Sequence, residues 1–389
     1  MTRIALFSGN YNYVREGANQ ALNQLVRYLE CEGGCRVRIY SPTTDTPAFE
    51  PAGMLVSVPS IPLPVRSEFR LALGLPRAMR KDVRRFSPDI VHVSTPDILG
   101  TRAQTFARQL GVPVVASMHT RFETYPEYYG LGWTRPLIEA HLRRFYRRSD
   151  HVLAPTPALV AGLKHMRGDD RVSLWSRGID RMLFNPARRD PLWRRSQGWS
   201  DDELVVLFFG RLVLEKGVAD FVSTVCILQE RGLKIRPLIV GAGPAASAFE
   251  TLSGVVMTGH LEGSELARAV ASADIMFNPS TTETFGNVVL EAMASGIAII
   301  CAGTANAEAL LEKGRSGILC PPGDVESYAA AIEGLNGSPI QRRKVGAAAR
   351  RASRGYSWTA ASESVARAYE TVLRDASRAE GGVLVVPRA

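Results

Sequence analysis

Several patterns that would assign a chain to a common class are missing from this one. No apolar run approaches the roughly 18–20 residues needed to span a bilayer. The opening residues, MTRIALFSGN, lead into an expected strand rather than a signal peptide. The five cysteines are scattered and odd in number, and no His or Cys pair completes a zinc site with Cys31 and Cys35. We therefore expect a soluble, cytoplasmic protein whose cysteines are reduced.

Two motifs for phosphate-bearing ligands are also absent. No G-x-G-x-x-G follows an early strand, which argues against a dinucleotide-dependent dehydrogenase. No Asp-x-Asp occurs, and the acidic pairs Asp169–Asp170 and Asp201–Asp202 fall in expected loops away from the carboxyl ends of strands. A divalent cation bridging a diphosphate is therefore not expected, and we expect neither a metal site nor a bound cofactor.

The composition is that of a globular protein, and predicted strands and helices alternate along the chain. Its 389 residues, 46% hydrophobic and 22% charged, favour two domains. Short β-branched runs predict strands at Arg3–Ser8, Arg36–Tyr40, Met54–Val58, Asp89–Val93, Val112–Ser117, Asp150–Ala154 and Arg171–Trp175. After a linker rich in Arg and Pro, further strands are predicted at Leu204–Phe209, Ile235–Val240, Val255–Thr258, Asp274–Asn278, Ala298–Cys301 and Gly317–Leu319.

Helical patterns lie between most of these strands, for example Glu16–Glu30 and Ile98–Gln109. The linker spans Asn185–Asp201, and the apolar spacing of Trp358–Arg374 predicts a packed helix near the end. We therefore predict an α/β fold of two doubly wound domains in tandem, in which ligands bind beyond the carboxyl ends of the parallel strands.

The net charge of +9 is concentrated in two segments. Seven basic residues lie between Arg66 and Arg85 and five between Trp133 and Arg148. Both segments are helix-like with interleaved apolar residues, which suits a membrane surface that carries anionic lipids. A solvated basic face is the alternative. Nucleic acid is disfavoured because no recognisable binding motif accompanies the charge.

The stretch Ala273–Cys301 holds two glutamates eight residues apart. It predicts a strand, a polar turn that contains Glu283, a helix from about Asn287 to Ser295 that contains Glu291, and a second strand. Free N–H groups and the positive dipole end at the helix start favour an anion. A sugar nucleotide needs amides for its diphosphate and carboxylates for its hydroxyls. The alternative is an ordinary crossover with one capping and one solvated glutamate.

Two candidates follow strands of the first half. Gly17 stands just before a helix, where it allows the backbone to approach a phosphate or sugar closely. His119 stands at the carboxyl end of the fifth strand, where it is placed to orient or polarise a hydroxyl. The alternative for His119 is a structural histidine bonded to a neighbouring backbone carbonyl.

The second half contains the motif GRLVLEKG directly after its first strand. Its Arg211 and Lys216 flank a short loop before a helix, and they supply the positive charge that a leaving diphosphate needs in the absence of a metal. VGAGP, at Val240–Pro244, predicts a tight strand-to-helix turn. Gly259–Leu261 ends the next strand and is placed to present backbone groups to a nucleobase.

Together these motifs resemble the retaining GT-B glycosyltransferases of family four. The resemblance spans nearly the whole chain and is carried by GRLVLEKG, VGAGP, GHLEGSELARAVASADIMFNPSTTETFGNVVLEAMASG and the closing SW helix. It implies two Rossmann-like domains that face a cleft. Residues 1–184 would form an acceptor-binding domain and residues 185–357 a nucleotide-sugar-binding domain, with a helix at 358–380 crossing back to the first.

The resemblance also implies roles for individual residues. Arg211 and Lys216 hold the diphosphate, Glu283 contacts the hydroxyls of the donor sugar, Glu291 contacts the ribose, and His119 lies near the reactive carbon of the sugar. The catalytic set is therefore His119, Arg211, Lys216 and Glu283. The donor-binding set is Gly17, Arg211, Lys216, Gly241, Leu261, Glu283, Thr284, Phe285, Gly286, Asn287, Val288 and Glu291.

A narrower resemblance is carried by STPDILG, SMHTRFETYPEYYGLGW and WSRGID. These are similar to the branch that contains GDP-mannose-dependent α-mannosyltransferases, sulfolipid synthases and related glycolipid synthases. The branch implies transfer to lipid acceptors at the cytoplasmic membrane face. Ala242 replaces the acidic residue usual in VGDGP, and REGAN replaces the commoner Gly-Gly or Asn-Gly of the first loop. Both departures leave the choice of donor open.

The expected function is therefore retaining, metal-independent transfer of a hexosyl group (EC 2.4 class) from GDP-mannose or a UDP-sugar to a membrane lipid or lipid-linked acceptor. The expected partners are the donor, the acceptor and an anionic membrane surface at the inner face of the cytoplasmic membrane. One alternative is transfer to a polysaccharide or a small soluble acceptor, since the acceptor is read by variable loops such as Pro59–Phe69. Another is a nucleotide-sugar-binding protein without turnover, which the intact charged residues of the site argue against.

Overall fold

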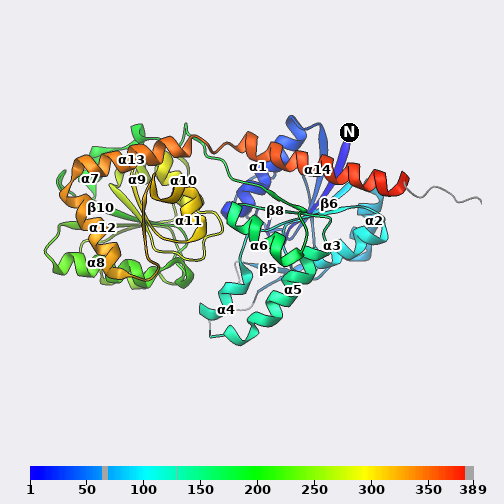
Figure 1. Ribbon diagram of the computed structural model, residues 1–389, viewed down its shortest axis with the longest axis horizontal. Helices are drawn as coiled ribbons and strands as arrows, with labels where there is room; N and C mark the ends of the chain where they lie inside the picture. The colour runs from blue at the N-terminus through cyan, green and yellow to red at the C-terminus, as the bar shows by residue number, and fades with distance from the viewer. Residues whose placement is uncertain (64–68, 129, 382–389) are drawn as a thin grey trace, which may run out of the picture. The chain divides into compact units, whose positions relative to one another are not determined.

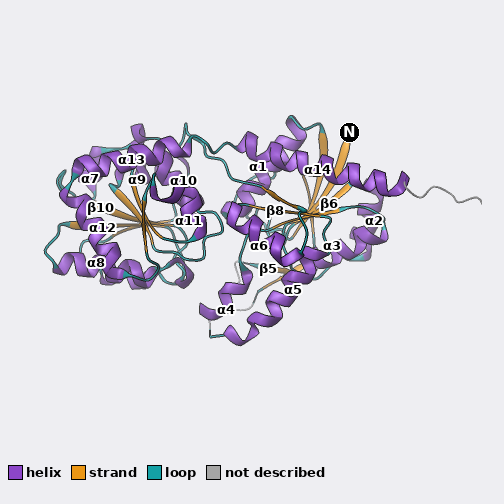
Figure 2. Ribbon diagram, viewed as in Figure 1, coloured by secondary structure: helices purple, strands orange, loops and turns teal. Residues whose placement is uncertain are grey.

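The computed structural model describes residues 1–63, 69–128 and 130–381. It divides into two compact units (Figure 1). Unit 1 consists of residues 1–123, 133–177 and the segment from Trp358 onward, and unit 2 consists of residues 124–132 and 178–357. Each unit has a parallel sheet at its centre and helices outside it (Figure 2).

Unit 1 is organised around a seven-stranded parallel sheet in the order β3-β2-β1-β6-β7-β8-β9. Its strands are β1 (Thr2–Phe7), β2 (Cys35–Ser41), β3 (Met54–Ser57), β6 (Ile90–Val93), β7 (Val114–Ser117), β8 (His151–Ala154) and β9 (Val172–Leu174). All seven strands predicted for the first half are present, each within two residues of its predicted ends. The prediction succeeds because strands covered on both faces are continuous apolar runs.

Helices cover this sheet on its two faces (Figure 2). They are α1 (Gly17–Cys31), α2 (Arg77–Phe86), α3 (Ile98–Gln109), α5 (Arg135–Arg147), α6 (Pro157–Arg167) and α14 (Trp358–Gly381), with short turns η1 (Phe122–Thr124) and η2 (Gly132–Thr134). The start of α3 is fixed by Asp97, whose carboxylate accepts a hydrogen bond from the N–H of Gly100 at 2.7 Å.

The segment Arg66–Arg85 is not the single basic helix that was predicted. Two short strands, β4 (Ser60–Pro62) and β5 (Arg70–Ala72), form an antiparallel pair, and helix α2 begins only at Arg77. Gly74, at φ 99°, lies between strand and helix and breaks any continuous helical path. Residues 64–68, which include Arg66 and part of the loop Pro59–Phe69, lie outside the described residues.

Helix α14 belongs to the core of unit 1. Its buried side chains pack in one cluster with α1 and with strands β1 and β2. Those side chains are Ala361, Val365, Ala368, Tyr369 and Val372. A segment more than 180 residues beyond the other parts of unit 1 therefore completes one face of its sheet.

Unit 2 is built on a six-stranded parallel sheet in the order β12-β11-β10-β13-β14-β15. Its strands are β10 (Leu204–Phe209), β11 (Ile235–Val240), β12 (Val256–Gly259), β13 (Ile275–Asn278), β14 (Ala298–Ala302) and β15 (Ile318–Cys320). The six strands predicted for the second half are all present, each within one residue of its predicted ends. Two apolar clusters, one on each face of the sheet, form the core.

Helices lie on both faces of the sheet of unit 2 (Figure 2). The α-helices that belong to the unit are α7 (Pro191–Ser196), α8 (Val218–Glu230), α9 (Gly263–Ser272), α10 (Asn287–Ala294), α11 (Ala305–Leu310), α12 (Val325–Gly337), α13 (Pro339–Ser353) and the four-residue α4 (Tyr125–Tyr128). The 3-10 turns are η3 (Pro186–Arg188), η4 (Leu214–Lys216), η5 (Ala246–Thr251) and η6 (Glu312–Gly314).

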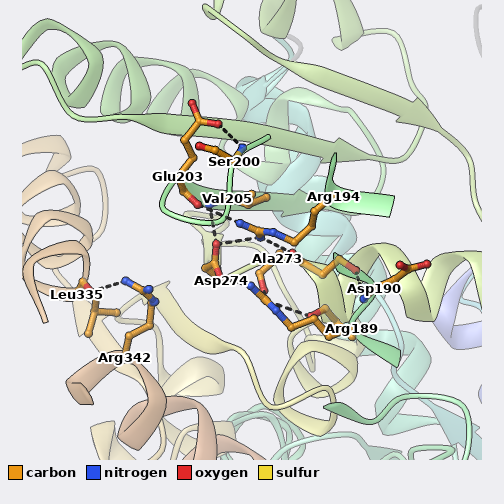
Figure 3. Close-up of polar contacts among 12 residues, drawn as sticks. Arg189, Asp190, Arg194, Ser200, Glu203, Val205, Ala273, Asp274, Leu335 and Arg342 are labelled. Carbon is orange, nitrogen blue, oxygen red and sulfur yellow. Dashed lines mark hydrogen bonds and ion pairs between the residues drawn. The ribbon is translucent and has the colours of Figure 1, made fainter. Parts of the chain in front are cut away.

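The segment Asn185–Asp201, predicted to be a linker, is an integral part of unit 2. It contains η3 and α7, and the side chain of Arg194 from α7 is only 3% exposed. Arg194 donates hydrogen bonds to the carbonyl of Ser272 at 2.7 Å and to the carboxylate of Asp274 at 3.1 Å (Figure 3). The arginines that made this segment look like a surface linker therefore anchor it to the body of the unit.

Asp274 is the centre of this network (Figure 3). Besides Arg194, it accepts a hydrogen bond from Arg189 at 2.7 Å and one from the N–H of Val205 at 2.9 Å. Because Val205 lies in β10 and Asp274 directly precedes β13, the carboxylate joins two neighbouring strands at their amino ends. The opposite ends of the same strands carry the candidate site.

Candidate functional site

Lys216 and Glu283 form an ion pair at the carboxyl ends of β10 and β13. The Nζ atom of Lys216 donates to Oε1 of Glu283 at 2.7 Å, and each side chain is 20% exposed. Lys216 ends the short turn η4, and Glu283 lies in the loop between β13 and α10. This edge of a parallel sheet is where such folds bind ligands. The pair places one cation and one carboxylate there, partly shielded from water.

The loop that carries Lys216 is held against the loop that carries Glu283. The carbonyl of Glu215 accepts hydrogen bonds from Thr282 at 2.9 Å and from Ser280 at 3.3 Å. Gly217 has φ 75°, and a Cβ atom there would lie 2.9 Å from backbone and side-chain atoms of Pro279. The two loops therefore pack so closely that the position of the lysine is fixed by backbone contacts.

Asn306 holds Glu283 from the opposite side. Its side-chain amide, in α11, donates to the backbone carbonyl of Glu283 at 2.7 Å, and the residue is 7% exposed. Sequence reasoning missed Asn306, Ser280 and Thr282 because each acts through a backbone carbonyl, which leaves no spacing pattern.

Helix α10 begins beside this pair with an uncapped amino terminus. Gly286, at φ 98°, is the N-cap residue of the helix and supplies no side-chain hydrogen bond to its first turn. The first backbone N–H that bonds within the helix is that of Leu290, which donates to the carbonyl of Gly286, so the amides of Asn287 to Val289 have no carbonyl of the helix to bond. The buried Oδ1 atom of Asn287 also has no hydrogen-bond partner among the described residues. Phe285 is buried against Tyr356 and fixes the approach to the helix. This geometry attracts an anion.

Glu291 lies one turn inside α10, as the sequence predicts. The residue retains some exposed surface, yet the surrounding protein atoms desolvate its carboxyl and raise its pKa from 4.5 to about 8. A carboxyl in this state is neutral over much of the physiological range. It is able to donate a hydrogen bond as well as accept one.

The remaining donor-site candidates of unit 2 lie on neighbouring loops. A Cβ atom on Gly241, at φ 142°, would lie 1.8 Å from the carbonyl oxygen of Gly210, so this position requires glycine. Arg211 is partly exposed in the loop that follows β10, and Thr284, also partly exposed, follows Glu283 in the chain. Leu261 packs at the border of one apolar cluster.

Two predicted site residues, Gly17 and His119, belong to unit 1. Gly17 is the partly exposed first residue of α1. His119, just after β7, is 9% exposed and both of its ring nitrogens are engaged: Nε2 with Ser117 Oγ at 2.8 Å and Nδ1 with Arg177 at 3.1 Å. Burial, followed by the charge of Arg177, holds the pKa of His119 well below 6.5. Sequence reasoning missed Arg177, although WSRGID contains it.

Two further features bear on the class of site. Among the described residues no group of three or more His, Cys, Asp or Glu side chains is arranged to hold a metal ion. The part of the chain that the structure describes also contains no helix with the length and apolarity to cross a bilayer. The five cysteines are all unpaired.

Comparison with known proteins agrees with this architecture. Residues 15–182 match the model of Glycosyltransferase Family 4, and residues 203–336 match that of Glycosyl transferases group 1. The structure superposes on sucrose-phosphate synthase from Thermosynechococcus elongatus with a TM-score of 0.77 at 19% identity, covering 96% of this chain and 100% of that one. The fold is therefore GT-B, and the class of protein is a glycosyltransferase that uses nucleotide sugars.

Sequence comparison finds relatives among glycosyltransferases of known activity. The chain is 34% identical to the GDP-mannose-dependent alpha-mannosyltransferase of Mycolicibacterium smegmatis over 95% of its length and 98% of the relative's. It is 31% identical to Sulfoquinovosyl transferase SQD2 of Arabidopsis thaliana, over 93% of this chain and 72% of the relative. It is also 25% identical to the Alpha-monoglucosyldiacylglycerol synthase of Acholeplasma laidlawii, over 81% of this chain and 84% of the relative. The chain belongs to glycosyltransferase family 4.

Proposed function

We propose that this enzyme moves a hexosyl group from GDP-mannose or a UDP-sugar to a membrane lipid or lipid-linked acceptor, with retention of anomeric configuration and without a metal ion. The observation that carries the proposal is the Lys216–Glu283 pair, 2.7 Å apart, next to the uncapped start of α10. A cation and a row of amides suit a diphosphate, and a carboxylate beside them suits the hydroxyls of the attached sugar.

In the proposed reaction the bond between the anomeric carbon and the diphosphate oxygen breaks as the acceptor oxygen bonds to the same face of the sugar. The departing phosphate accepts the acceptor's proton. Lys216, Arg211 and the amides of α10 stabilise the negative charge that develops on the diphosphate. Glu283 contacts the sugar hydroxyls and Glu291 the ribose. No residue forms a covalent intermediate in this scheme, so Glu283 acts as a binding group.

The reaction class is tested with a panel of UDP- and GDP-sugars, each assayed for nucleotide release with and without extracted membrane lipid. We expect release that depends on lipid, that persists in EDTA, and that gives a product whose anomeric proton signal matches the configuration of the donor. A strict requirement for Mn²⁺, or an inverted product, would contradict the proposal. Release with a polysaccharide or a small soluble acceptor instead of lipid would favour that alternative acceptor class.

Lys216→Ala tests the site itself. Removing one group that stabilises charge in the transition state typically lowers kcat by roughly 10²–10³, and we expect a loss in that range. Lys234→Ala is the matched control, since Lys234 makes a 3.4 Å surface pair with Asp202 and is 73% exposed. If Lys216→Ala and Lys234→Ala had the same kcat, Lys216 would not stabilise the transition state.

The lipid acceptor is supported by an exposed apolar and basic surface on unit 1. Trp133, in the turn η2 that precedes α5, is 74% exposed, and Leu137, in the first turn of α5, is 69% exposed. Arg143, Arg144 and Arg147 are exposed further along the same helix. Large apolar side chains that face solvent beside clustered arginines suit the boundary of an anionic bilayer. We propose that this surface docks on such a membrane.

Vesicle binding tests the docking surface. We expect binding to rise with the fraction of anionic lipid and to fall with salt, because the arginines act through screened charge. The double variant Trp133→Ser with Leu137→Ser should bind at least about tenfold more weakly, since two apolar side chains no longer enter the bilayer. Leu192→Ser is the control, because Leu192 is an equally exposed leucine (73%) in unit 2. Binding that ignores lipid charge and salt would overturn the docking proposal.

A further inference from the structure

A continuous line of five buried polar side chains crosses unit 1. Arg177 contacts Nδ1 of His119 at 3.1 Å, and Nε2 of His119 contacts Ser117 Oγ at 2.8 Å. The same hydroxyl contacts Nε2 of His92 at 2.9 Å, and Nδ1 of His92 contacts the hydroxyl of Tyr369 at 2.6 Å. All five side chains are 9% exposed or less. The line runs from Arg177, which follows β9, past the ends of β7 and β6 to helix α14.

The direction of the first two hydrogen bonds in this line follows from its first member. A guanidinium only donates, so Nδ1 of His119 accepts and the ring proton of His119 lies on Nε2. That proton is donated to Ser117, and we assign the hydroxyl proton of Ser117 to the bond with Nε2 of His92. The ring proton of His92 therefore lies on Nδ1 and is donated to Tyr369. The two histidines are thus neutral and hold opposite tautomers.

The surroundings agree with two neutral rings. Burial lowers the pKa of His92 from 6.5 to about 3, and it lowers that of His119 as well. The indole of Trp175 packs edge-on against both, with ring centroids 5.1 Å from His119 and 6.1 Å from His92. Arg177 also donates to the carbonyl of Trp175 at 3.0 Å, which fixes the guanidinium. Chains of hydrogen bonds inside a protein reinforce one another, and they are costly when one member is left unpaired.

We propose that Arg177, Ser117, His92 and Tyr369 are positioning residues that hold His119 as a neutral, Nε2-protonated imidazole in one fixed orientation. The proposal rests on the proposed function and on the role that the family resemblance implies for His119, near the reactive carbon of the donor sugar. A fixed neutral ring presents the same surface to every sugar that binds and adds no positive charge next to an anomeric carbon that becomes electron-poor as its bond breaks. Because Tyr369 is part of the line, helix α14 takes part in setting that orientation.

Histidine side-chain ¹⁵N NMR on the full-length protein without substrate tests the tautomers. The chain has six histidines, and His119→Gln and His92→Gln identify the two signals by their loss. We expect His119 protonated on Nε2 and His92 on Nδ1, both without titration between pH 6 and 8. The same tautomer at both positions, or a charged ring at pH 7, would overturn the proposal. This readout needs no transfer reaction, so it is separate from a failure of the proposed function.

Ser117→Ala then tests the positioning role, because it removes the middle of the line. The buried hydrogen bonds it breaks suggest a loss in kcat of roughly fivefold to tenfold, with donor KM nearly unchanged and with tautomer signals that become mixed. Ser117→Thr retains the hydroxyl and should restore most of the rate. Ser94→Ala is the matched control, since Ser94 is 2% exposed and its hydroxyl has no hydrogen-bond partner among the described residues. A kcat for Ser117→Ala equal to that of Ser94→Ala would overturn the positioning role.

Discussion

At the scale of single residues, the proposed donor site combines ionisable groups that are held in different ways. Glu283 is paired with Lys216 and remains partly exposed. Glu291, eight positions later on the first turns of α10, is instead desolvated, so its pKa lies near 8. An environment that disfavours a carboxylate lowers stability once the pH is high enough for the unfolded chain to ionise. Such environments are common at functional sites.

Glu291→Gln tests whether the desolvated carboxyl of Glu291 lowers the stability of the protein and strengthens the binding of nucleotide. Between pH 4.5 and about 8 the unfolded chain has lost the proton of Glu291 and the folded chain retains it, so stability falls as pH rises. Glutamine cannot ionise. The variant should therefore be more stable than wild type at pH 8, by roughly 1 to 3 kcal/mol because the residue is partly exposed, and equal to it near pH 4.5. Urea unfolding across this pH range measures the difference.

The same variant should bind nucleoside diphosphate roughly tenfold more weakly, because an amide replaces a carboxyl at the ribose. Titration calorimetry measures that change. Glu250→Gln, at an exposed position, is the control and should follow the wild-type curves. A Glu291→Gln protein that loses stability at pH 8, or that binds nucleotide as wild type does, would contradict the assignment.

The sequence predicted the residues whose signal is local and missed those whose partners are distant. Glu283 and Glu291 were singled out because each lies within a few residues of the start of α10, and Lys216 because it lies in a charged loop just after β10. That Lys216 and Glu283, 67 residues apart, pair with each other could not be read from either motif. The line through His119 was not found, because Tyr369 and His92 are 277 residues apart in the chain. His119 itself was placed correctly at a strand end, yet the sequence did not reveal that both of its ring nitrogens are engaged.

At the scale of elements, parallel strands were predictable to within two residues because both of their faces are buried. The hairpin β4–β5 was missed, since its strands are three residues long and Ala72 is their one buried residue. The segment Asn185–Asp201 was misread for the opposite reason. Its arginines are polar in the sequence, and only the fold shows that Arg194 is buried against a carboxylate.

Asp274→Asn tests how strongly that segment is anchored. The substitution leaves the buried guanidinium of Arg194 without its carboxylate, and breaking one side of a buried pair typically costs about 3–5 kcal/mol. We expect the free energy of unfolding of unit 2 to fall by about 3 kcal/mol, because asparagine keeps one acceptor. Asp201→Asn is the control, since its pair with Arg195 is 59% and 68% exposed and should contribute about 0–1 kcal/mol. Similar urea midpoints for the two variants would show that the segment is not anchored by Asp274.

At the scale of the whole molecule, the two units differ in how the chain builds them. Nearly all of unit 2 is one continuous segment, residues 178–357, which carries Lys216, Glu283 and Glu291. Unit 1 is discontinuous, because its sheet is completed by α14 from the end of the chain. The five apolar side chains that α14 buries contribute roughly 5 kcal/mol at about 1 kcal/mol each, which is comparable to the total stability of many domains.

This difference predicts unlike behaviour for the two halves when they are expressed apart. Residues 178–357 should fold as a monomer and bind UDP or GDP, because their core is complete and they contain every predicted donor-binding residue except Gly17. Residues 1–177 alone should aggregate, since removing α14 uncovers apolar side chains of α1 such as Leu22 and Leu25. Adding residues 358–381 through a flexible linker should restore a folded monomer, as measured by circular dichroism and size-exclusion chromatography. A stable monomer formed by residues 1–177 would show that α14 is dispensable for folding, and its link through Tyr369 to His92 would then be its remaining contribution.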